Sequence, residues 1–116
     1  MSTTFVFHNI KLVCGPTMTD VYTCPSTNVN GNVSAAIVFA IQATNVSNIS
    51  DAITVVWTDA SNGNVATRLT FSTPIAPNQS IGCLTGRIVL EPGDKIRAQC
   101  VSNSSVELSG SVLETI

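Results

Sequence analysis

Hydrophobic and polar residues alternate with a period of two along much of this chain. The segment 51–60, DAITVVWTDA, places Ile53, Val55 and Trp57 on one face and two threonines on the opposite face. Alternation of β-branched and aromatic residues with polar residues is typical of a half-buried strand. The pattern therefore predicts a strand over residues 51–60, with Trp57 in the core.

The segment 32–46, NVSAAIVFAIQATNV, contains the longest apolar stretch. Its central alanines are compatible with a helix, but its valine and isoleucine side chains have restricted rotamers that favour strands. Strict alternation predicts one long strand. One face of that strand carries Val33, Ala35, Ile37, Phe39 and Ile41. We expect Phe39, like Phe71 later in the chain, to lie in the core.

Short turn signals separate the predicted strands. Asn62 and Gly63 both accept positive φ values, and such a pair is a strong hairpin signal. They predict a hairpin that joins the strand 51–60 to a strand over residues 65–71.

The segment 88–100, IVLEPGDKIRAQC, contains a second turn signal. Proline fixes φ and the following glycine supplies a positive φ, as the central pair of a type II turn requires. Pro92 and Gly93 therefore predict a hairpin between strands 86–90 and 95–101. Within the second strand, alternation places Lys95 and Arg97 on one face and Ile96, Ala98 and Cys100 on the other.

The tail 105–116, SVELSGSVLETI, alternates again, and Gly110 within it predicts a β-bulge. Altogether the chain shows about eight short strands, no convincing helix and no internal repeat. This pattern predicts an all-β fold, a single antiparallel β-sandwich or jelly roll of about eight strands. The length of 116 residues predicts that residues 1–116 form one domain.

Composition adds that the surface carries few charges. Charged residues make up 10% of the chain, whereas typical domains contain about 25%. Few lysines guard the predicted sheet edges, and an exposed edge recruits other chains. The composition favours a protein that packs against neighbours. The alternative is a free β-domain solvated by serine, threonine and asparagine.

The basic residues do not form a patch for nucleic acid. The net charge is −2, and the five cations are separate from one another and from aromatic residues: Lys11, Arg68, Arg87, Lys95 and Arg97. Binding to phosphates requires a basic patch that releases counterions, so we expect no nucleic-acid partner. The apolar stretch SAAIVFAIQA is too short to span a bilayer, so we expect no membrane partner. The first residues lack a secretory signal, so we expect synthesis in the cytoplasm.

No constellation of residues indicates catalysis, a cofactor or a metal. His8 is the single histidine, and no acid lies near it in sequence. The four cysteines lack the short spacings of structural zinc sites. We therefore expect no enzymatic activity, no cofactor-binding residues and no metal ligands.

The four cysteines are candidates for disulfides or crosslinks: Cys14, Cys24, Cys83 and Cys100. Cys14 and Cys24 lie next to turn residues, so we expect their sulfurs to be exposed and able to bond each other or a neighbouring chain. Cys100 lies on the Ile96 side of its strand, where packing in the core is the expected role.

Two segments resemble a family of small β-rich virion proteins of tailed bacteriophages. They are VYTCPSTNVNGNVSAAIVFAIQATNVSNISDAITVVWTDASNGN and IAPNQSIGCLTGRIVLEPGDKIRAQCVSNSSVELSGSVLE, within residues 20–114. The likeness lies mainly in the turn residues, as in the LEPGD segment. Cys24 and Cys100 stand where the family often has valine or alanine, which favours a role for them beyond packing.

The resemblance implies a structural subunit of the virion without enzymatic activity. Its expected place is the outer capsid, as a decoration or cement protein, or the neck or collar. Expected partners are major capsid, neck or tail proteins and copies of itself, joined by packing and intermolecular disulfides. The alternative is a carbohydrate- or receptor-binding β-sandwich module of a tail fibre, for which Tyr22 is the expected sugar-stacking residue.

Overall fold

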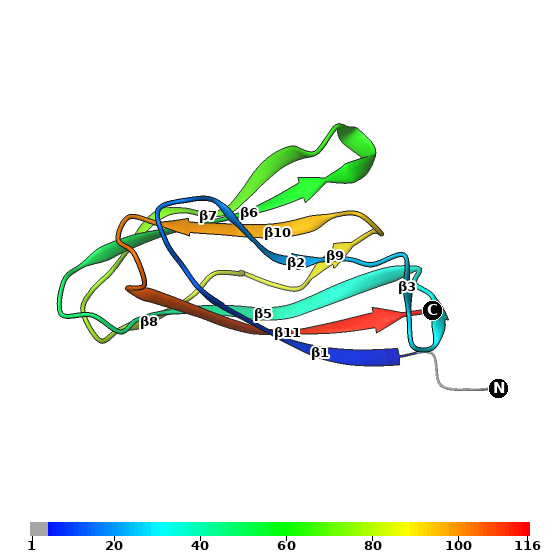
Figure 1. The fold of residues 1–116 in the computed structure, drawn as a ribbon, viewed down its shortest axis with the longest axis horizontal. Helices are drawn as coiled ribbons and strands as arrows, with labels where there is room; N and C mark the ends of the chain where they lie inside the picture. The colour runs from blue at the N-terminus through cyan, green and yellow to red at the C-terminus, as the bar shows by residue number, and fades with distance from the viewer. Residues whose placement is uncertain (1–4) are drawn as a thin grey trace.

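Nine of eleven β-strands form two facing sheets, and the other two form a separate hairpin, in the computed structural model of this protein, which describes residues 5–116 (Figure 1). One 3₁₀ helix, η1, spans Ala60–Asn62. The strands are β1 (Phe5–Val13), β2 (Thr19–Thr23), β3 (Thr27–Asn28), β4 (Gly31–Asn32), β5 (Ala35–Asn45), β6 (Asp51–Asp59), β7 (Val65–Ile75), β8 (Ser80–Gly82), β9 (Ile88–Leu90), β10 (Lys95–Cys100) and β11 (Val106–Thr115). The predicted all-β antiparallel sandwich is confirmed.

The strands are wound as a jelly roll. One sheet has the order β1-β11-β5-β8, with β9 also paired to β5, and the other has the order β2-β10-β6-β7. Because β8 and β9 share one position beside β5, these strands occupy eight positions. Counted along the chain, the first position pairs with the eighth (β1 with β11) and the second with the seventh (β2 with β10). The third pairs with the sixth (β5 with β8 and β9) and the fourth with the fifth (β6 with β7), and all these pairs are antiparallel. The count of about eight strands was therefore close, and the additional strands are the short β3–β4 hairpin and the divided β8/β9 position.

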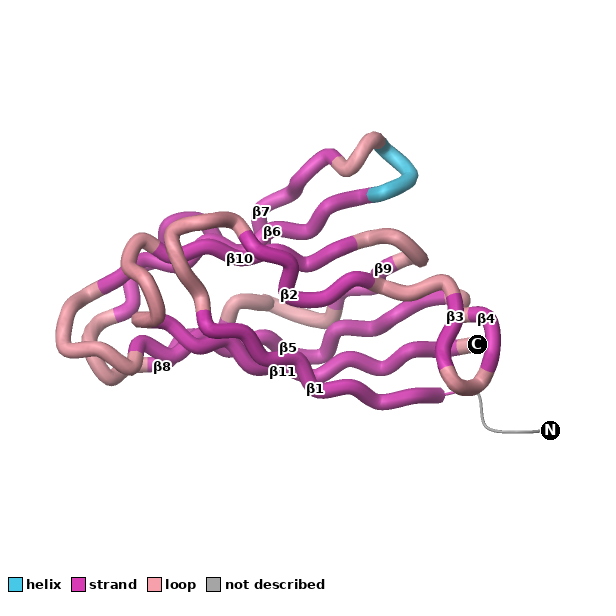
Figure 2. Tube along the Cα trace, viewed as in Figure 1, coloured by secondary structure: helices cyan, strands magenta, loops and turns pink. Residues whose placement is uncertain are grey.

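The two sheets lie in facing layers (Figure 2), and the hydrophobic core is formed by residues of both. Its fully buried members come from both layers, and the largest are Ile53, Ile75, Leu90, Ile96 and Leu108. Apolar burial on this scale is the dominant stabilising contribution in a domain of this size. Within residues 5–116 we find no helix with the length and apolar character needed to cross a membrane.

A β-bulge in β5 changes which residues face the core. Ser111 of β11 pairs with Ala40, but Val112 pairs with Val38, so Phe39 is the extra residue. Before the bulge Val38 is buried, and after it Ile41 is buried. Prediction of one continuous face along this strand was therefore wrong. Phe39, expected in the core, is 36% exposed because the bulge turns it outward.

A second irregularity lies in β7, where Phe71 is 62% exposed rather than buried. The register between β6 and β7 shifts on either side of Val55, and Ser72 beside Phe71 has a φ of 45°. The expected hairpin between β6 and β7 is confirmed, with η1 and Gly63 (φ 67°) in the turn. Trp57 is only partly buried, at the rim of the core.

The turn at Pro92 and Gly93 does not form the predicted hairpin. Gly93 has the expected positive φ, 93°, but β9 pairs with β5 in one sheet and β10 pairs with β2 and β6 in the other. The turn therefore carries the chain from one layer to the next. The prediction of a turn at Pro92 and Gly93 was correct, but the partners of the flanking strands are set by the topology of the whole jelly roll.

Gly110 lies where the backbones of β5 and β11 are in close contact, so a substitution there tests that contact. A Cβ atom added there would collide with the Ala40 carbonyl oxygen beside the bulge, and backbone cannot move away cheaply. We expect Gly110→Ala to lower the free energy of unfolding by about 1–3 kcal/mol, measured by urea denaturation. Gly82→Ala in β8 is the control and should change little, because an added Cβ there has no atom within 4 Å apart from those of its chain neighbours. Equal stabilities of the two variants would contradict this reading.

Candidate assembly interface

All four cysteines are buried free thiols. Cys14 and Cys24 are each 1% exposed, Cys83 is 2% exposed and Cys100 is 3% exposed. The prediction that turns expose Cys14 and Cys24 was therefore wrong, whereas the core position of Cys100 is confirmed. Backbone pairing explains the error: the Cys14 N–H donates to the Val106 oxygen (2.8 Å) and the Cys24 N–H to the Asp94 oxygen (2.9 Å).

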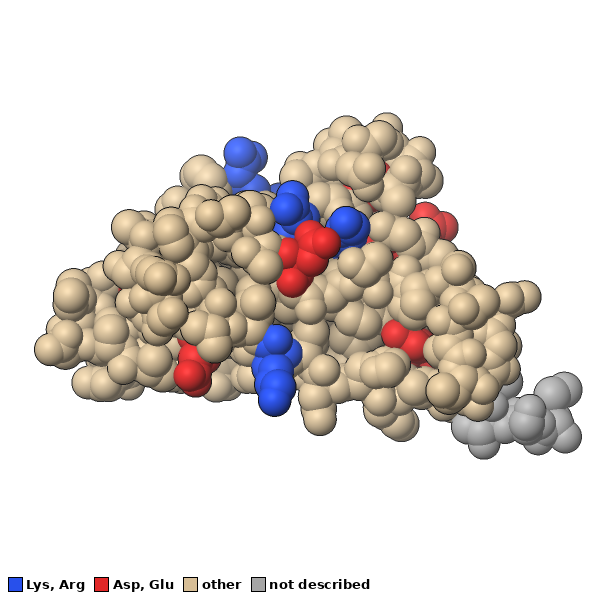
Figure 3. Space-filling model, in the orientation of Figure 1, with Lys and Arg blue, Asp and Glu red and all other residues tan. Residues whose placement is uncertain are grey.

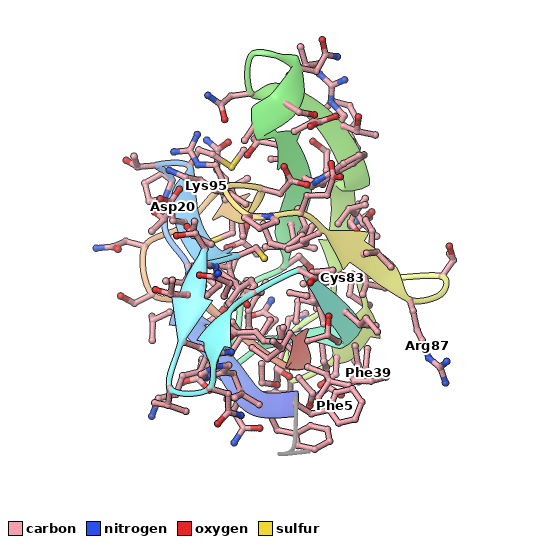
Figure 4. The ribbon with its side chains drawn as sticks, turned by 90° about the vertical axis from the view of Figure 1, so that its right-hand side faces the viewer. Phe5, Asp20, Phe39, Cys83, Arg87 and Lys95 are labelled. Atoms are coloured by element: carbon pink, nitrogen blue, oxygen red, sulfur yellow. The ribbon has the colours of Figure 1, made fainter. Side chains whose placement is uncertain are left out.

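Burial also makes these thiols poor nucleophiles. Desolvation, followed by the nearby Cys100, raises the pKa of Cys14 to about 12, and desolvation raises the pKa of Cys24 to about 11. The thiolate, which is the reactive form, is therefore scarce at neutral pH. Figure 4 shows Cys83 between the two layers. Another chain cannot reach these sulfurs without local unfolding, so their geometry supports packing rather than crosslinking.

A buried carboxylate, Glu114 on β11, ties together three separate elements. Tyr22 of β2 donates its hydroxyl to Oε2 (2.5 Å), Asn28 of β3 donates to Oε1 (2.9 Å), and Nε2 of His8 on β1 lies 3.1 Å from Oε1. Burial tends to raise the Glu114 pKa, but these hydrogen bonds and the His8 charge outweigh it, so the pKa is lowered. Tyr22, the residue expected to stack on sugar, is thus partly buried, with its hydroxyl bonded to Glu114.

The remaining buried acids hold loops. Asp94, 1% exposed, accepts hydrogen bonds from the N–H groups of Ala60 and Glu91 (2.9 Å each). Asp59 and Glu91 bring their carboxylates within 4.8 Å of that of Asp94, a grouping that sequence reasoning missed. Because backbone donors already occupy both Asp94 oxygens, this group has the features of a loop anchor.

The outer face of the β2-β10-β6-β7 sheet carries an ion-paired group of three charged residues. Lys95 and Arg97 lie on one strand face, as predicted, and both donate to Asp20 (3.2 and 2.8 Å). Figure 3 shows blue and red atoms together in this region and a largely uncharged surface elsewhere in the view. Figure 4 places Asp20 and Lys95 on the side opposite Phe39 and Arg87.

An apolar row crosses the outer face of the other sheet. Phe7 pairs with Leu113, Leu113 with Ile37, and Ile37 with Val89, so these four side chains share one line across four strands. Phe7 is 75% exposed and Val89 is 57% exposed. At strand spacings of about 4.8 Å the row is about 14 Å long. We call it the outer apolar row.

Two more aromatic residues extend the outer apolar row. Phe5 lies two residues before Phe7 on β1 and is 52% exposed. Phe39 lies on the same sheet, and the guanidinium of Arg87 sits 5.4 Å from its ring centroid (Figure 4). Contiguous exposed apolar surface of this kind marks interaction sites on soluble proteins. The alternating pattern of Phe5, Val6 and Phe7 was visible in the sequence, but the sequence did not show that the two phenylalanines point to solvent.

A polar hollow of about 450 Å³ lies on the opposite sheet, around β6 and β7. Phe71 lines it with the Arg68 guanidinium 4.6 Å from its ring centroid. The Thr58 hydroxyl beside it is buried and has no hydrogen-bond partner among residues 5–116. The hollow was not expected from the sequence, because Phe71 was predicted to lie in the core.

The lowered pKa of Glu114 predicts that the stability of the protein depends on pH. A carboxylate whose pKa is lowered by folding stabilises the protein fully above its ordinary pKa, here 4.5, and loses that contribution as pH falls through the folded-state pKa. We expect Glu114→Gln to lower the free energy of unfolding by about 1–3 kcal/mol at neutral pH. The loss should shrink as the pH falls below 4.5. Exposed Glu107→Gln on the same strand is the control, and identical pH profiles would contradict this role.

No protein-family model matches the chain, and no curated protein matches it in sequence. Solved structures match in fold. A chain of the Helicobacter pylori bacteriophage KHP30 capsid has a TM-score of 0.58 and 9% identity, covering 100% of this chain and 90% of that one. A chain of the Bacillus endospore appendages, described as disulfide-linked pili, has a TM-score of 0.53 and 13% identity, with coverage of 100% and 92%.

Infectious bursal disease virus, Gx strain, provides a third match with a TM-score of 0.53 and 8% identity. It covers 96% of this chain but 30% of the viral chain, so this protein corresponds to about a third of that subunit. At such identities the likeness concerns the fold alone. The fold of this chain is therefore similar to folds found in viral capsid and pilus proteins.

Proposed function

We propose that this protein is a non-enzymatic structural subunit of a virus particle, held by packing against neighbouring subunits. The outer apolar row carries the proposal, because it leaves apolar side chains in water on a chain that is only 10% charged. Covering these side chains would be favourable by roughly 25 cal/mol per Å² removed from water. The fold shared with viral capsid and pilus subunits supports the same role.

A more specific assignment is a subunit of a tailed-phage virion, on the outer capsid as a decoration or cement protein or at the neck or collar. The sequence resemblance over residues 20–114 supports it. Its partners would be major capsid, neck or tail proteins and further copies of this chain. Because the cysteines are buried, the proposal depends on packing and not on disulfides between subunits.

Carbohydrate binding, as in a tail-fibre receptor module, is a second candidate. The hollow at Phe71 favours it, because an exposed aromatic ring lies among guanidinium, amide and hydroxyl groups that suit a polyhydroxylated ligand. Sugar rings would stack on Phe71. A glycan-array screen in which wild type and Phe71→Ala give the same background signal would reject this candidate.

Incorporation into particles tests the structural role. We expect mass spectrometry of purified particles to detect the wild-type chain. Val89→Asp places a charge in the outer apolar row and should reduce incorporation at least tenfold, since an unpaired buried charge costs more than the ~1.4 kcal/mol of a tenfold effect. Val29→Asp, at a position 91% exposed in the β3–β4 turn, is the matched control and should incorporate normally. Absence of the wild-type chain from particles would refute the proposal.

A further inference from the structure

We infer that β1 is a contact between copies of this protein, pairing antiparallel with β1 of a second copy about a twofold axis at Asn9. The inference rests on the proposed assembly role and specifies one partner, one edge and one register for it. The resulting contact would join two five-stranded sheets into one continuous sheet.

The free side of β1 exposes backbone groups of the odd-numbered residues. β1 ends the sheet order β1-β11-β5, and no other strand within residues 5–116 pairs with it. The Cys14 N–H donates to Val106 on β11, whereas the Phe5 carbonyl accepts from the Asn30 side chain (3.3 Å) on the other side. Because neighbouring residues of a strand turn these groups to opposite sides, Phe7, Asn9 and Lys11 direct theirs to the free edge.

The other sheet edges are less suited to pairing. β8 and β9 have three residues each, and β2 has five. β7 is long, but Ser72 has a positive φ and Pro74 lacks an N–H. β1 has nine residues, no proline, no positive φ and no register shift against β11. Lys11 is its single lysine, and natural edges use such charges to discourage pairing. β1 is therefore the longest uninterrupted edge of the sandwich.

The side chains of β1 are complementary to a second β1 in one register. With Asn9 opposite Asn9 of the second copy, Phe7 faces Lys11 and Phe5 faces Val13. Phe7 (75% exposed) would gain a cation at its ring. Phe5 and Val13, 52% and 58% exposed, would cover each other. The central Asn9 pair and the flanking Phe7–Lys11 pairs would each exchange two backbone hydrogen bonds.

Other registers lose part of this contact. A shift by one residue places an edge-facing residue opposite one whose backbone groups already bond to β11, which breaks the ladder. A shift by two restores the ladder but leaves either Phe5 or Val13 without a partner. The register centred on Asn9 therefore pairs the whole of β1, although the Phe5 carbonyl must exchange its Asn30 contact for a strand partner.

Sedimentation velocity of the full chain at several concentrations tests the pairing. Wild type should form dimers, and Asn9→Pro should raise the dissociation constant at least tenfold because it removes the central edge-facing N–H. Proline is tolerated at a strand edge where the N–H faces solvent. Asn9→Thr keeps the N–H and should associate as wild type does. A monomeric wild type, or equal association of wild type and Asn9→Pro, overturns the inference.

Crosslinking provides a measurement that does not depend on the proline variant folding. Across a hydrogen-bonded antiparallel pair the Cα atoms lie about 5.5 Å apart, within the range of a disulfide. Oxidised glutathione should join two Asn9→Cys chains, the two thiols passing their hydrogens to form two molecules of reduced glutathione. Ser61→Cys, in the exposed η1 turn, is the control. Crosslinking of Asn9→Cys no faster than Ser61→Cys contradicts the pairing.

Mass spectrometry of particles separates this inference from the proposed function. If Asn9→Pro enters particles as wild type does, and wild type is monomeric, the structural role stands and the β1 pairing is wrong. If the chain pairs through β1 but is absent from particles, the pairing stands and the virion assignment is wrong.

Discussion

The β-bulge at Phe39 determines much of what this protein presents to solvent. A strand in a sandwich must turn every second side chain into the core, and one extra residue reverses that alternation. The bulge lets Val38 and Ile41 both reach the core, and it turns Phe39 and Ala40 outward. Gly110 of β11 makes this possible, because the Ala40 backbone lies where a Cβ atom would be.

Buried polar side chains fix the ends of the roll where apolar packing has no directional preference. Asn45 and Asp51 bond to loop backbone at one set of turns, and Asp94 does so at another. Glu114 instead joins side chains of β1, β2 and β3. A buried polar group without partners is costly, so these bonds favour one arrangement of the loops over alternatives. The acids of this chain have, in the structure, mainly such architectural roles.

The two outer faces of the sandwich differ in character. One carries Asp20, Lys95 and Arg97 in an ion-paired group, and the other carries the outer apolar row. A free domain gains nothing from an apolar row in water, whereas a subunit covered by a neighbour gains the energy of its burial. The proposed assembly role would account for both the row and the scarcity of charge, and a jelly roll supplies sheet faces and edges for it.

The sequence by itself determined the all-β class, the approximate strand positions, the hairpin at Gly63 and the inward face of β10, because these depend on local alternation and turn chemistry. Only the tertiary structure decided the rest. Cys14 and Cys24 are buried where distant segments, at Val106 and Asp94, bond to their backbones. Phe39 and Phe71 are exposed because the ladder is irregular beside them. Pro92 and Gly93 link two sheets because β9 and β10 find their partners far along the chain. Long-range pairing has no signature in a local pattern, so the outer apolar row could be recognised only after the strands were in place.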